Sequence, residues 1–226
     1  MKNKGKLNIP GKTPVPKPTS LPTGKRPSIM IAVPAMEMVN AEFAQHLAMA
    51  SAQLVAHGIK INCAFNIGSV ITIARRNLVD IFLKSDFEYI WWVDSDMKFP
   101  IDAPLRLLAR NKDIVGCNYL KRTKPLKPVA YKNIGDWDSY LPLTVQDELV
   151  KVEGVGMGCI LMKTEIFKQI QKPYFEFTYN EKSDDWLGED FNLLTKFRNI
   201  GYEVYIDTLL SSEIKHMGLY AYGTNK

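Results

Sequence analysis

The sequence predicts an α/β fold in which a mainly parallel sheet is flanked by helices. Short apolar runs typical of buried strands alternate with segments whose apolar residues recur at helical spacing, which is the pattern of consecutive β-α-β units. The chain has 226 residues, of which 46% are hydrophobic and 23% are charged. This is enough for one large domain with a hydrophobic core. No internal repeat is present, which excludes solenoids and propellers.

The predicted strands and helices alternate regularly as far as residue 118. Pro34 ends the first continuous apolar run, Gly58 follows the first helical segment as a stop, and Pro104 opens the third helix. The predicted strands cover residues 28–34, 59–65, 88–93 and 114–118, and the predicted helices cover residues 41–56, 73–83 and 104–110.

The alternation changes after Tyr119. Residues 121–149 are rich in proline, lysine and turn-forming residues, and they predict an irregular region. A strand is predicted over residues 150–162, although glycines interrupt it. Further helices are predicted over residues 163–169 and 189–200, and a late strand over residues 202–206.

The net charge of +5 is concentrated in the first 27 residues. This segment contains seven basic residues, no acidic residue and six of the 13 prolines, which leaves 22 basic and 24 acidic residues for the remainder. We therefore predict a disordered basic arm over residues 1–27 and a folded domain over residues 28–226. The arm is either a solubilising leader or a contact for a polyanion, such as nucleic acid or an anionic membrane surface.

Cysteine content and hydropathy predict a cytoplasmic protein. The three cysteines, Cys63, Cys117 and Cys159, are odd in number and far apart, so they indicate neither a disulfide framework nor a zinc site. No apolar run approaches the length of a membrane span, and the lysine-rich N-terminus lacks the apolar segment of a signal peptide.

The most informative motif is Asp94-Ser95-Asp96, which directly follows the predicted strand 88–93. Ligand crevices of open α/β sheets form at the carboxyl ends of strands. Two carboxylates placed there repel each other unless a cation lies between them, and oxygen ligands suit Mg²⁺ or Mn²⁺. The alternative is that Asp94 caps the next turn while Asp96 is solvated. A second Asp-x-Asp, Asp136-Trp137-Asp138, lies in a predicted loop and is attributed to chance.

In its context, Trp-Trp-Val-Asp94-Ser-Asp96-Met, this motif resembles the metal-binding Asp-x-Asp of GT-A-fold glycosyltransferases. Three further segments resemble that family in the expected order, so the resemblance covers roughly residues 28–218. They are the Ala-Arg75-Arg76-Asn77 element, the glycine-rich Gly156-Met-Gly158 segment and the acidic Trp186-Leu-Gly-Glu189-Asp190 motif. The resemblance implies a Rossmann-type, GT-A-like sheet with a small acceptor-side region of strands and loops.

The resemblance also implies an activity and a set of site residues. A sugar moves from a nucleotide-sugar donor, by default a UDP-sugar, to an acceptor hydroxyl, with inversion favoured and retention left open. Asp190 is the implied general base and Glu189 its partner, while Asp94, Asp96 and His216 are the implied ligands of Mn²⁺ or Mg²⁺. The implied donor-binding residues are Pro34, Arg75, Arg76, Asp94, Ser95, Asp96, Gly156 and Gly158.

The neighbouring arginines and acids each leave a choice open. Arg75 and Arg76 lie about 100° apart around a helix, so one can face the crevice while the other reaches solvent. The arginine that faces the crevice could bind a diphosphate oxygen or stack on the nucleobase. Glu189 and Asp190 are separated by the same angle, so one can bond to the scaffold while the other meets an acceptor hydroxyl. Acids in the first turn also favour the helix dipole, which is a sufficient structural explanation for one of them.

The remaining candidates have structural explanations of similar weight. Gly156 and Gly158 alternate along a predicted strand, so they either let a sugar approach the backbone or accommodate a bulky neighbour such as Trp186. His216 is a metal ligand or a core histidine. The basic segment 121–128 is a lid over a phosphate-bearing substrate or a solvated loop, and the solvated loop is favoured. Ser69 and Thr72 precede a helix whose free N–H groups could meet an anion.

Two other functions remain as alternatives. A nucleotidyltransferase would use the same sheet edge, but such enzymes have a glycine-rich basic loop after the first strand, where this chain has Pro34-Ala-Met-Glu-Met. A catalytically silent module that binds nucleic acid or glycan is the other alternative. The sequence leaves the acceptor open among a surface glycan, a protein and a modified DNA base.

Overall fold

The fold is described from a computed structural model that covers residues 26–145, 147–181, 184–218 and 221–222. Of the predicted basic arm, residues 1–25 lie outside this description. Within the described residues, the main feature is a seven-stranded sheet with the order β2-β1-β3-β7-β5-β10-β6. Its strands are β1 (Ser28–Ala35), β2 (Lys60–Ile67), β3 (Tyr89–Val93), β5 (Ile114–Gly116), β6 (Leu149–Val152), β7 (Cys159–Lys163) and β10 (Val204–Asp207).

The sheet is mainly parallel. Strand β1 pairs in parallel with β2 and β3, and β5 pairs in parallel with β10. Strand β7 lies antiparallel between β3 and β5, and β6 is antiparallel to β10 at the edge. Five of these seven strands therefore run in one direction, which confirms the predicted α/β class.

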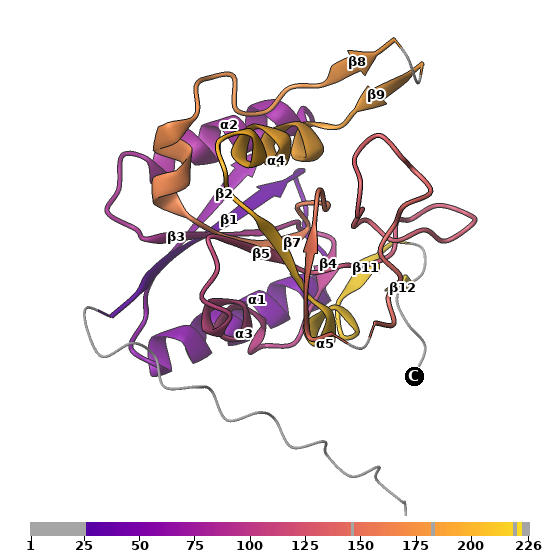
Figure 1. The fold of residues 1–226 in the computed structure, drawn as a ribbon. Helices are drawn as coiled ribbons and strands as arrows, with labels where there is room; N and C mark the ends of the chain where they lie inside the picture. The colour runs from indigo at the N-terminus through magenta and orange to yellow at the C-terminus, as the bar shows by residue number, and fades with distance from the viewer. Residues whose placement is uncertain (1–25, 146, 182–183, 219–220, 223–226) are drawn as a thin grey trace, which may run out of the picture.

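Helices cover both faces of the sheet. Figure 1 shows α2 and α4 on one side and α1, α3 and α5 on the other. The helices are α1 (Ala41–Ala56), α2 (Ile71–Phe82), α3 (Ala103–Ala109), α4 (Glu189–Asn199) and α5 (Thr208–Ser211), with a 3₁₀ helix η1 (Thr164–Gln169) after β7. No helix within the described residues has the length and apolar character needed to cross a membrane.

Two smaller sheets complete the fold. Strands β4 (Met97–Lys98), β11 (Lys215–Met217) and β12 (Ala221–Tyr222) form one, and β8 (Thr178–Asn180) with β9 (Asp185–Leu187) forms a hairpin that projects beside α4 (Figure 1). The resemblance implied a small region of strands and loops, but the bounds of these strands were not predicted, because two- and three-residue strands carry too little periodicity to be recognised.

The local sequence explains the best-predicted helix, α1. The side chain of Asn40 accepts a hydrogen bond from the Glu42 N–H and caps the first turn. Gly58 ends the helix with φ of +74°, a conformation that favours glycine. The residues at helical spacing between these signals form the buried face. The predicted bounds of this helix, 41–56, are confirmed.

The core has two layers because β3 is covered on both faces. Trp91 and Trp92 are both completely buried, and successive side chains of a strand point to opposite faces. Trp91 packs edge-to-face on Phe99 with ring centroids 5.2 Å apart, whereas Trp92 packs on Phe175 at 5.7 Å. This explains why β3 reads as a continuous apolar run, which is typical of strands buried on both sides.

The predicted single strand over residues 150–162 is wrong. The segment forms two strands, β6 at the edge of the sheet and β7 near its centre, and the glycine-containing stretch 153–158 crosses between them. Both strands are apolar, so hydropathy alone could not show that the chain changes its place in the sheet. The predicted helix over residues 163–169 is instead the 3₁₀ helix η1.

Candidate functional site

The Asp94-Ser95-Asp96 motif lies where the sequence predicted, directly after β3 at the carboxyl edge of the parallel strands. The residues form a tight turn into β4, in which the Met97 N–H donates to the Asp94 carbonyl at 3.1 Å. The Asp94 N–H donates to the Gly158 carbonyl at 3.2 Å, which ties the turn to the start of β7. All three residues are partly exposed. The other Asp-x-Asp forms a local turn in which the Asp138 N–H donates to the Asp136 side chain.

Arg75 is the central positive charge of the site. It projects from α2, is 3% exposed and binds two carboxylates. Its Nη1 donates to Glu189 Oε1 at 2.5 Å, and its Nη2 donates to Asp94 Oδ1 at 3.2 Å. Arg76 is exposed and bonds to Asn77, so Arg75 is the arginine that faces the crevice. Its guanidinium bridges α4 and the end of β3 and holds these two acids in place.

The electrostatics of Arg75 favour its charged form. Burial works to lower the pKa of Arg75, but the negative charges of Asp94, Glu189 and Asp190 overcome this effect and raise it. Removing any one charge from this buried group of a guanidinium and carboxylates would destabilise the folded protein, because the remaining charges would be desolvated and unpaired.

Glu189 and Asp190 have different surroundings although they are adjacent. They begin α4 after Gly188, and Glu189 is held in the ion pair with Arg75. Among the hydrogen bonds of the described residues, Asp190 Oδ1 accepts one, from the N–H of the neighbouring Phe191 at 2.8 Å. Burial and the nearby charge of Glu189 raise the pKa of Asp190 to about 6. A carboxyl group with this pKa is well suited to accept a proton near neutral pH.

Strand pairing brings His216 to Asp96. Strand β11 lies antiparallel to β4, with His216 opposite Met97, and the Met217 N–H donates to the Asp96 carbonyl at 2.6 Å. His216 Nε2 then lies 3.3 Å from Asp96 Oδ2. Although burial opposes it, the hydrogen bond and charge of His216 and the charge of Arg122 lower the pKa of Asp96.

The predicted three-ligand metal site does not form as one cluster. Asp94 points to Arg75 and Asp96 points to His216, and no group of three His, Cys, Asp or Glu side chains within the described residues is arranged to hold a metal. The positive charge that faces Asp94 is that of Arg75. Asp96 Oδ1 is buried without a hydrogen-bond partner. An Asp96–His216 pair still fits a divalent cation that takes its other ligands from water and substrate phosphates.

Tyr119 was missed by the sequence analysis and occupies the space left by the glycines. Its hydroxyl accepts the Gly158 N–H at 2.8 Å, and its ring packs edge-to-face on His216. A Cβ on Gly156 would lie 2.8 Å from this hydroxyl. The bulky neighbour that the glycines accommodate is therefore Tyr119 and not Trp186, which is 60% exposed. Burial and the nearby negative charge of Asp94 raise the pKa of Tyr119 well above its usual range.

We predict that Gly158→Ala destabilises the protein by about 1–3 kcal/mol, because the added Cβ overpacks a filled site. It would overlap Tyr119 Oη and lie 2.8 Å from Tyr119 Cζ and 3.0 Å from Met97 Sδ. The measurement is the free energy of unfolding in urea. Gly68→Ala is the matched control, because no atom lies within 4 Å of its added Cβ. Equal stabilities for the two variants would contradict the packing role of Tyr119.

The basic segment 121–128 contributes one residue to the site. Arg122 Nη2 lies 3.1 Å from Asp96 Oδ2, and Arg122 Nη1 donates to the Met217 carbonyl. Lys121 donates to the Tyr131 hydroxyl at 2.8 Å. Residues 122–126 are exposed, so the segment is largely the solvated loop that the sequence favoured, with anchors at Lys121 and Arg122. A cationic run following the fourth predicted strand was the signal that could have identified Arg122.

The remaining residues that were predicted to bind the nucleotide-sugar donor lie near the carboxyl edge of the sheet, but they are not part of the group formed by Arg75, Asp94 and Glu189. Pro34 is the second-to-last residue of β1; it is buried and lies opposite Asn66 of β2. Ser95 is partly exposed within the Asp-x-Asp turn. Helix α2 begins at Ile71, so Thr72 lies inside its first turn, and Val70 provides no side-chain cap. The first N–H groups of α2 are therefore not capped by that residue.

No protein-family model and no curated protein matches this sequence. Among solved structures, the chain is similar to A197 from STIV, with 17% identity over 88% of this chain and 95% of that chain and a TM-score of 0.57. A mutant of Drosophila β1,4-galactosyltransferase 7 in complex with manganese, UDP-Gal and xylobiose matches with 16% identity over 85% of this chain and 71% of that chain, with a TM-score of 0.49. The similarity to A197 shows a shared fold.

Proposed function

We propose that this protein is a glycosyltransferase of the GT-A type, which transfers a sugar from a nucleotide-sugar donor to an acceptor hydroxyl. One observation carries the proposal: a buried arginine, Arg75, binds the strand-end acid Asp94 and the helix-start acid Glu189 at the carboxyl edge of the sheet. This arrangement keeps Asp190, whose pKa is raised to about 6, beside the Asp-x-Asp turn. Edge position and a perturbed carboxyl group together are typical of catalytic sites in α/β folds.

Each residue has a defined role in the proposed reaction. Asp190 accepts the proton of the acceptor hydroxyl, and the hydroxyl oxygen forms a bond to the anomeric carbon of the donor. The bond from that carbon to the donor phosphate oxygen breaks, and its electron pair leaves with the nucleoside diphosphate. In-line attack from the opposite face inverts the configuration at this carbon. Arg75 is a positioning residue, because its charge is committed to Asp94 and Glu189.

The departing nucleoside diphosphate is an anion, and a nearby positive charge stabilises it as it leaves. Asp96 and His216 are the residues that would hold Mn²⁺ or Mg²⁺ here, and such an ion supplies Lewis-acid stabilisation of the departing diphosphate. Arg122 adds a fixed cation at the same position, 3.1 Å from Asp96. The donor that we propose first is a UDP-sugar, on the basis of the family resemblance of the motifs.

We expect Asp96→Ala to lower sugar transfer by about 10³-fold or more while changing the melting temperature little, because the side chain is partly exposed at the site. The experiment incubates purified protein with a panel of nucleotide sugars, Mn²⁺ and glycan, protein or oligonucleotide acceptors, and detects products by mass spectrometry. Asp138→Ala is the matched control, because it belongs to the other Asp-x-Asp and its side chain is 92% exposed.

The products separate the proposed function from its alternatives. Transfer releases a nucleoside diphosphate and a glycosylated acceptor, whereas nucleotidyl transfer from a nucleoside triphosphate releases inorganic diphosphate. Full activity of Asp96→Ala, or activity that is unaffected by a chelator, would contradict the assignment of Asp96 and the metal. A wild-type protein that consumes no nucleotide sugar in the panel would contradict the proposed function itself.

A further inference from the structure

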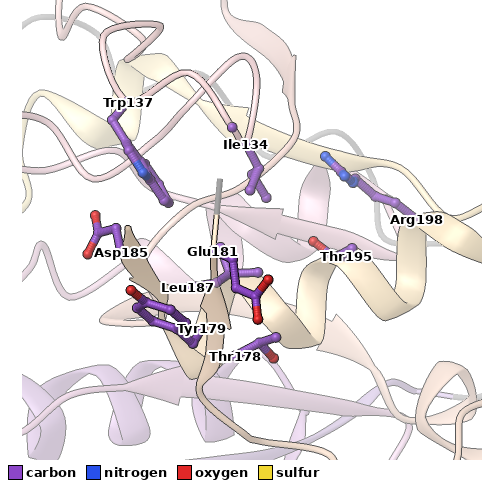
Figure 2. Close-up of a pocket in the computed structure, with 10 residues that line it drawn as sticks. Ile134, Trp137, Thr178, Tyr179, Glu181, Asp185, Leu187, Thr195 and Arg198 are labelled. Atoms are coloured by element: carbon purple, nitrogen blue, oxygen red, sulfur yellow. The ribbon is translucent and has the colours of Figure 1, made fainter. Parts of the chain in front are cut away.

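A hollow lies on the flank of α4. It is a pocket of about 610 Å³ between α4, the β8–β9 hairpin and the loop of residues 134–137 (Figure 2). This volume is within the range of small-molecule binding sites. The residues that carry the argument are Trp137, Thr178, Glu181, Asp185, Thr195 and Arg198.

Trp137 provides a fixed aromatic surface in this pocket. Its ring packs edge-to-face on Tyr131, with centroids 5.2 Å apart, and on Phe191, at 5.7 Å. Figure 2 shows the ring directed toward the hairpin across the pocket. A held aromatic ring offers apolar contact area at little entropic cost to a ligand that has one apolar face.

The polar lining of the pocket is acidic. Glu181 and Asp185 are exposed at the hairpin, and no salt bridge to either occurs among the described residues. Arg198 is the cation in the wall, but its Nη1 is bound to Glu153 Oε2 at 2.9 Å. The sequence of residues 181–185 contains three acids and one lysine. Carboxylates accept hydrogen bonds from hydroxyl groups and repel phosphates, so the lining favours a neutral polyol over a polyanion.

The α4 wall contains polar atoms that the described residues leave unsatisfied. Thr195 Oγ1 and Arg198 Nε are both buried without a hydrogen-bond partner in that part of the chain. Buried polar atoms without partners are rare in folded proteins, and a bound water is one explanation for them. They lie on the same face of α4, because residues three apart on a helix are neighbours.

The pocket lies against the helix that also carries the proposed base. Asp190 precedes Thr195 by five residues, which is about 7.5 Å along the axis of α4. Leu187, three residues before Asp190, lines the pocket from the hairpin side. Five residues also turn the helix by about 140°, so Asp190 and Thr195 project in different directions from the same helix.

We propose that this pocket binds a neutral oligosaccharide, with an apolar ring face on Trp137 and hydroxyl groups on Glu181 and Asp185. Its role as the acceptor site rests on the proposed function, but its ligand class follows from the pocket itself. The acidic lining also argues against a nucleic acid as the ligand of this pocket.

The direct test is ¹⁹F NMR of full-length protein labelled with 5-fluorotryptophan. The chain has four tryptophans, so Trp137 and Trp186 are assigned by the signals that Trp137→Phe and Trp186→Phe remove. The probes are cellobiose, lactose, maltose, chitobiose and xylobiose, with a single-stranded DNA oligonucleotide as the polyanion. We expect at least one disaccharide to shift the Trp137 signal saturably and to leave the signals of Trp186 and of the buried Trp91 and Trp92 unchanged.

Variants test the contacts. Trp137→Ala should weaken binding of the disaccharide about tenfold or more, because a central aromatic anchor is lost. Trp186→Ala is the matched control, since this residue is exposed and does not line the pocket, and we expect its affinity to lie within twofold of wild type. Because Asp185 is exposed, Asp185→Ala should fold normally, and we expect it to weaken binding of the disaccharide about fivefold to tenfold.

The outcomes distinguish this inference from the proposed function, because saccharide binding requires neither donor nor metal. Binding at Trp137 without any sugar transfer would support the pocket and contradict the glycosyltransferase proposal. Transfer with an acceptor KM that is unchanged in Asp185→Ala would contradict the pocket while the function stands. A Trp137 signal that no disaccharide shifts, or that only the oligonucleotide shifts, would overturn the inference.

Discussion

Asp190→Asn is expected to lower sugar transfer by about 10²–10⁴-fold, the range associated with loss of a general base. The amide keeps the shape of the side chain and can still accept the Phe191 N–H, so α4 should begin normally. The measurement compares kcat for transfer with donor affinity for the variant and for wild type, and we expect donor affinity to be preserved. Glu189→Gln is the comparison variant. A large loss in donor affinity for Asp190→Asn would place this acid in the donor site instead.

The pH profile provides an independent check on Asp190. Its pKa is raised to about 6 by burial and by the charge of Glu189, and the base acts only when it is deprotonated. Activity should therefore be full above pH 7 and fall about tenfold for each unit of pH below 6. The residual activity of Asp190→Asn should lack this acid limb. An unchanged acid limb in the variant would assign the titration to another group.

Arg75→Met should lower the free energy of unfolding by about 3–5 kcal/mol, as expected when one partner of a buried ion pair is removed. The change leaves Asp94 and Glu189 without their cation, and the Glu189 side chain is only 11% exposed. Urea unfolding measures the loss. Arg76→Met is the matched control on the same helix, and its effect should be under about 0.5 kcal/mol because Arg76 is exposed.

Two further measurements separate the charge effect of Arg75 from simple loss of packing. Adding Glu189→Gln to Arg75→Met should restore part of the stability, because one of the unpaired acids is then neutral. The variant should also gain stability as the pH falls, because carboxyl groups left buried without a cation have raised pKa values and bind protons in the folded state. A stability loss below about 1 kcal/mol would contradict the ion-pair role of Arg75.

The sequence by itself determined the α/β class, the first helix and the location of the Asp-x-Asp motif. These features depend on local signals: Asn40 and Gly58 delimit α1, and the apolar run through Trp91 and Trp92 identifies a strand buried on both faces. Residues that follow a strand lie at its carboxyl end, so identifying this strand also placed Asp94 and Asp96 at the carboxyl edge of the parallel strands. Motif spacing also identified Glu189 and Asp190 at the start of a helix, which is where they lie.

Only the tertiary structure decided what these residues contact. Arg75 and Glu189 are 114 positions apart in the chain, and the choice between Arg75 and Arg76 depended on which face of α2 meets α4. The glycines at 156 and 158 make room for Tyr119, and β6 and β7 separate in the sheet, because packing between distant segments overrides the local pattern. The pairing of β11 with β4 places His216 beside Asp96 across 120 positions. Such contacts depend on the long-range arrangement of the strands, which periodicity within one segment cannot specify.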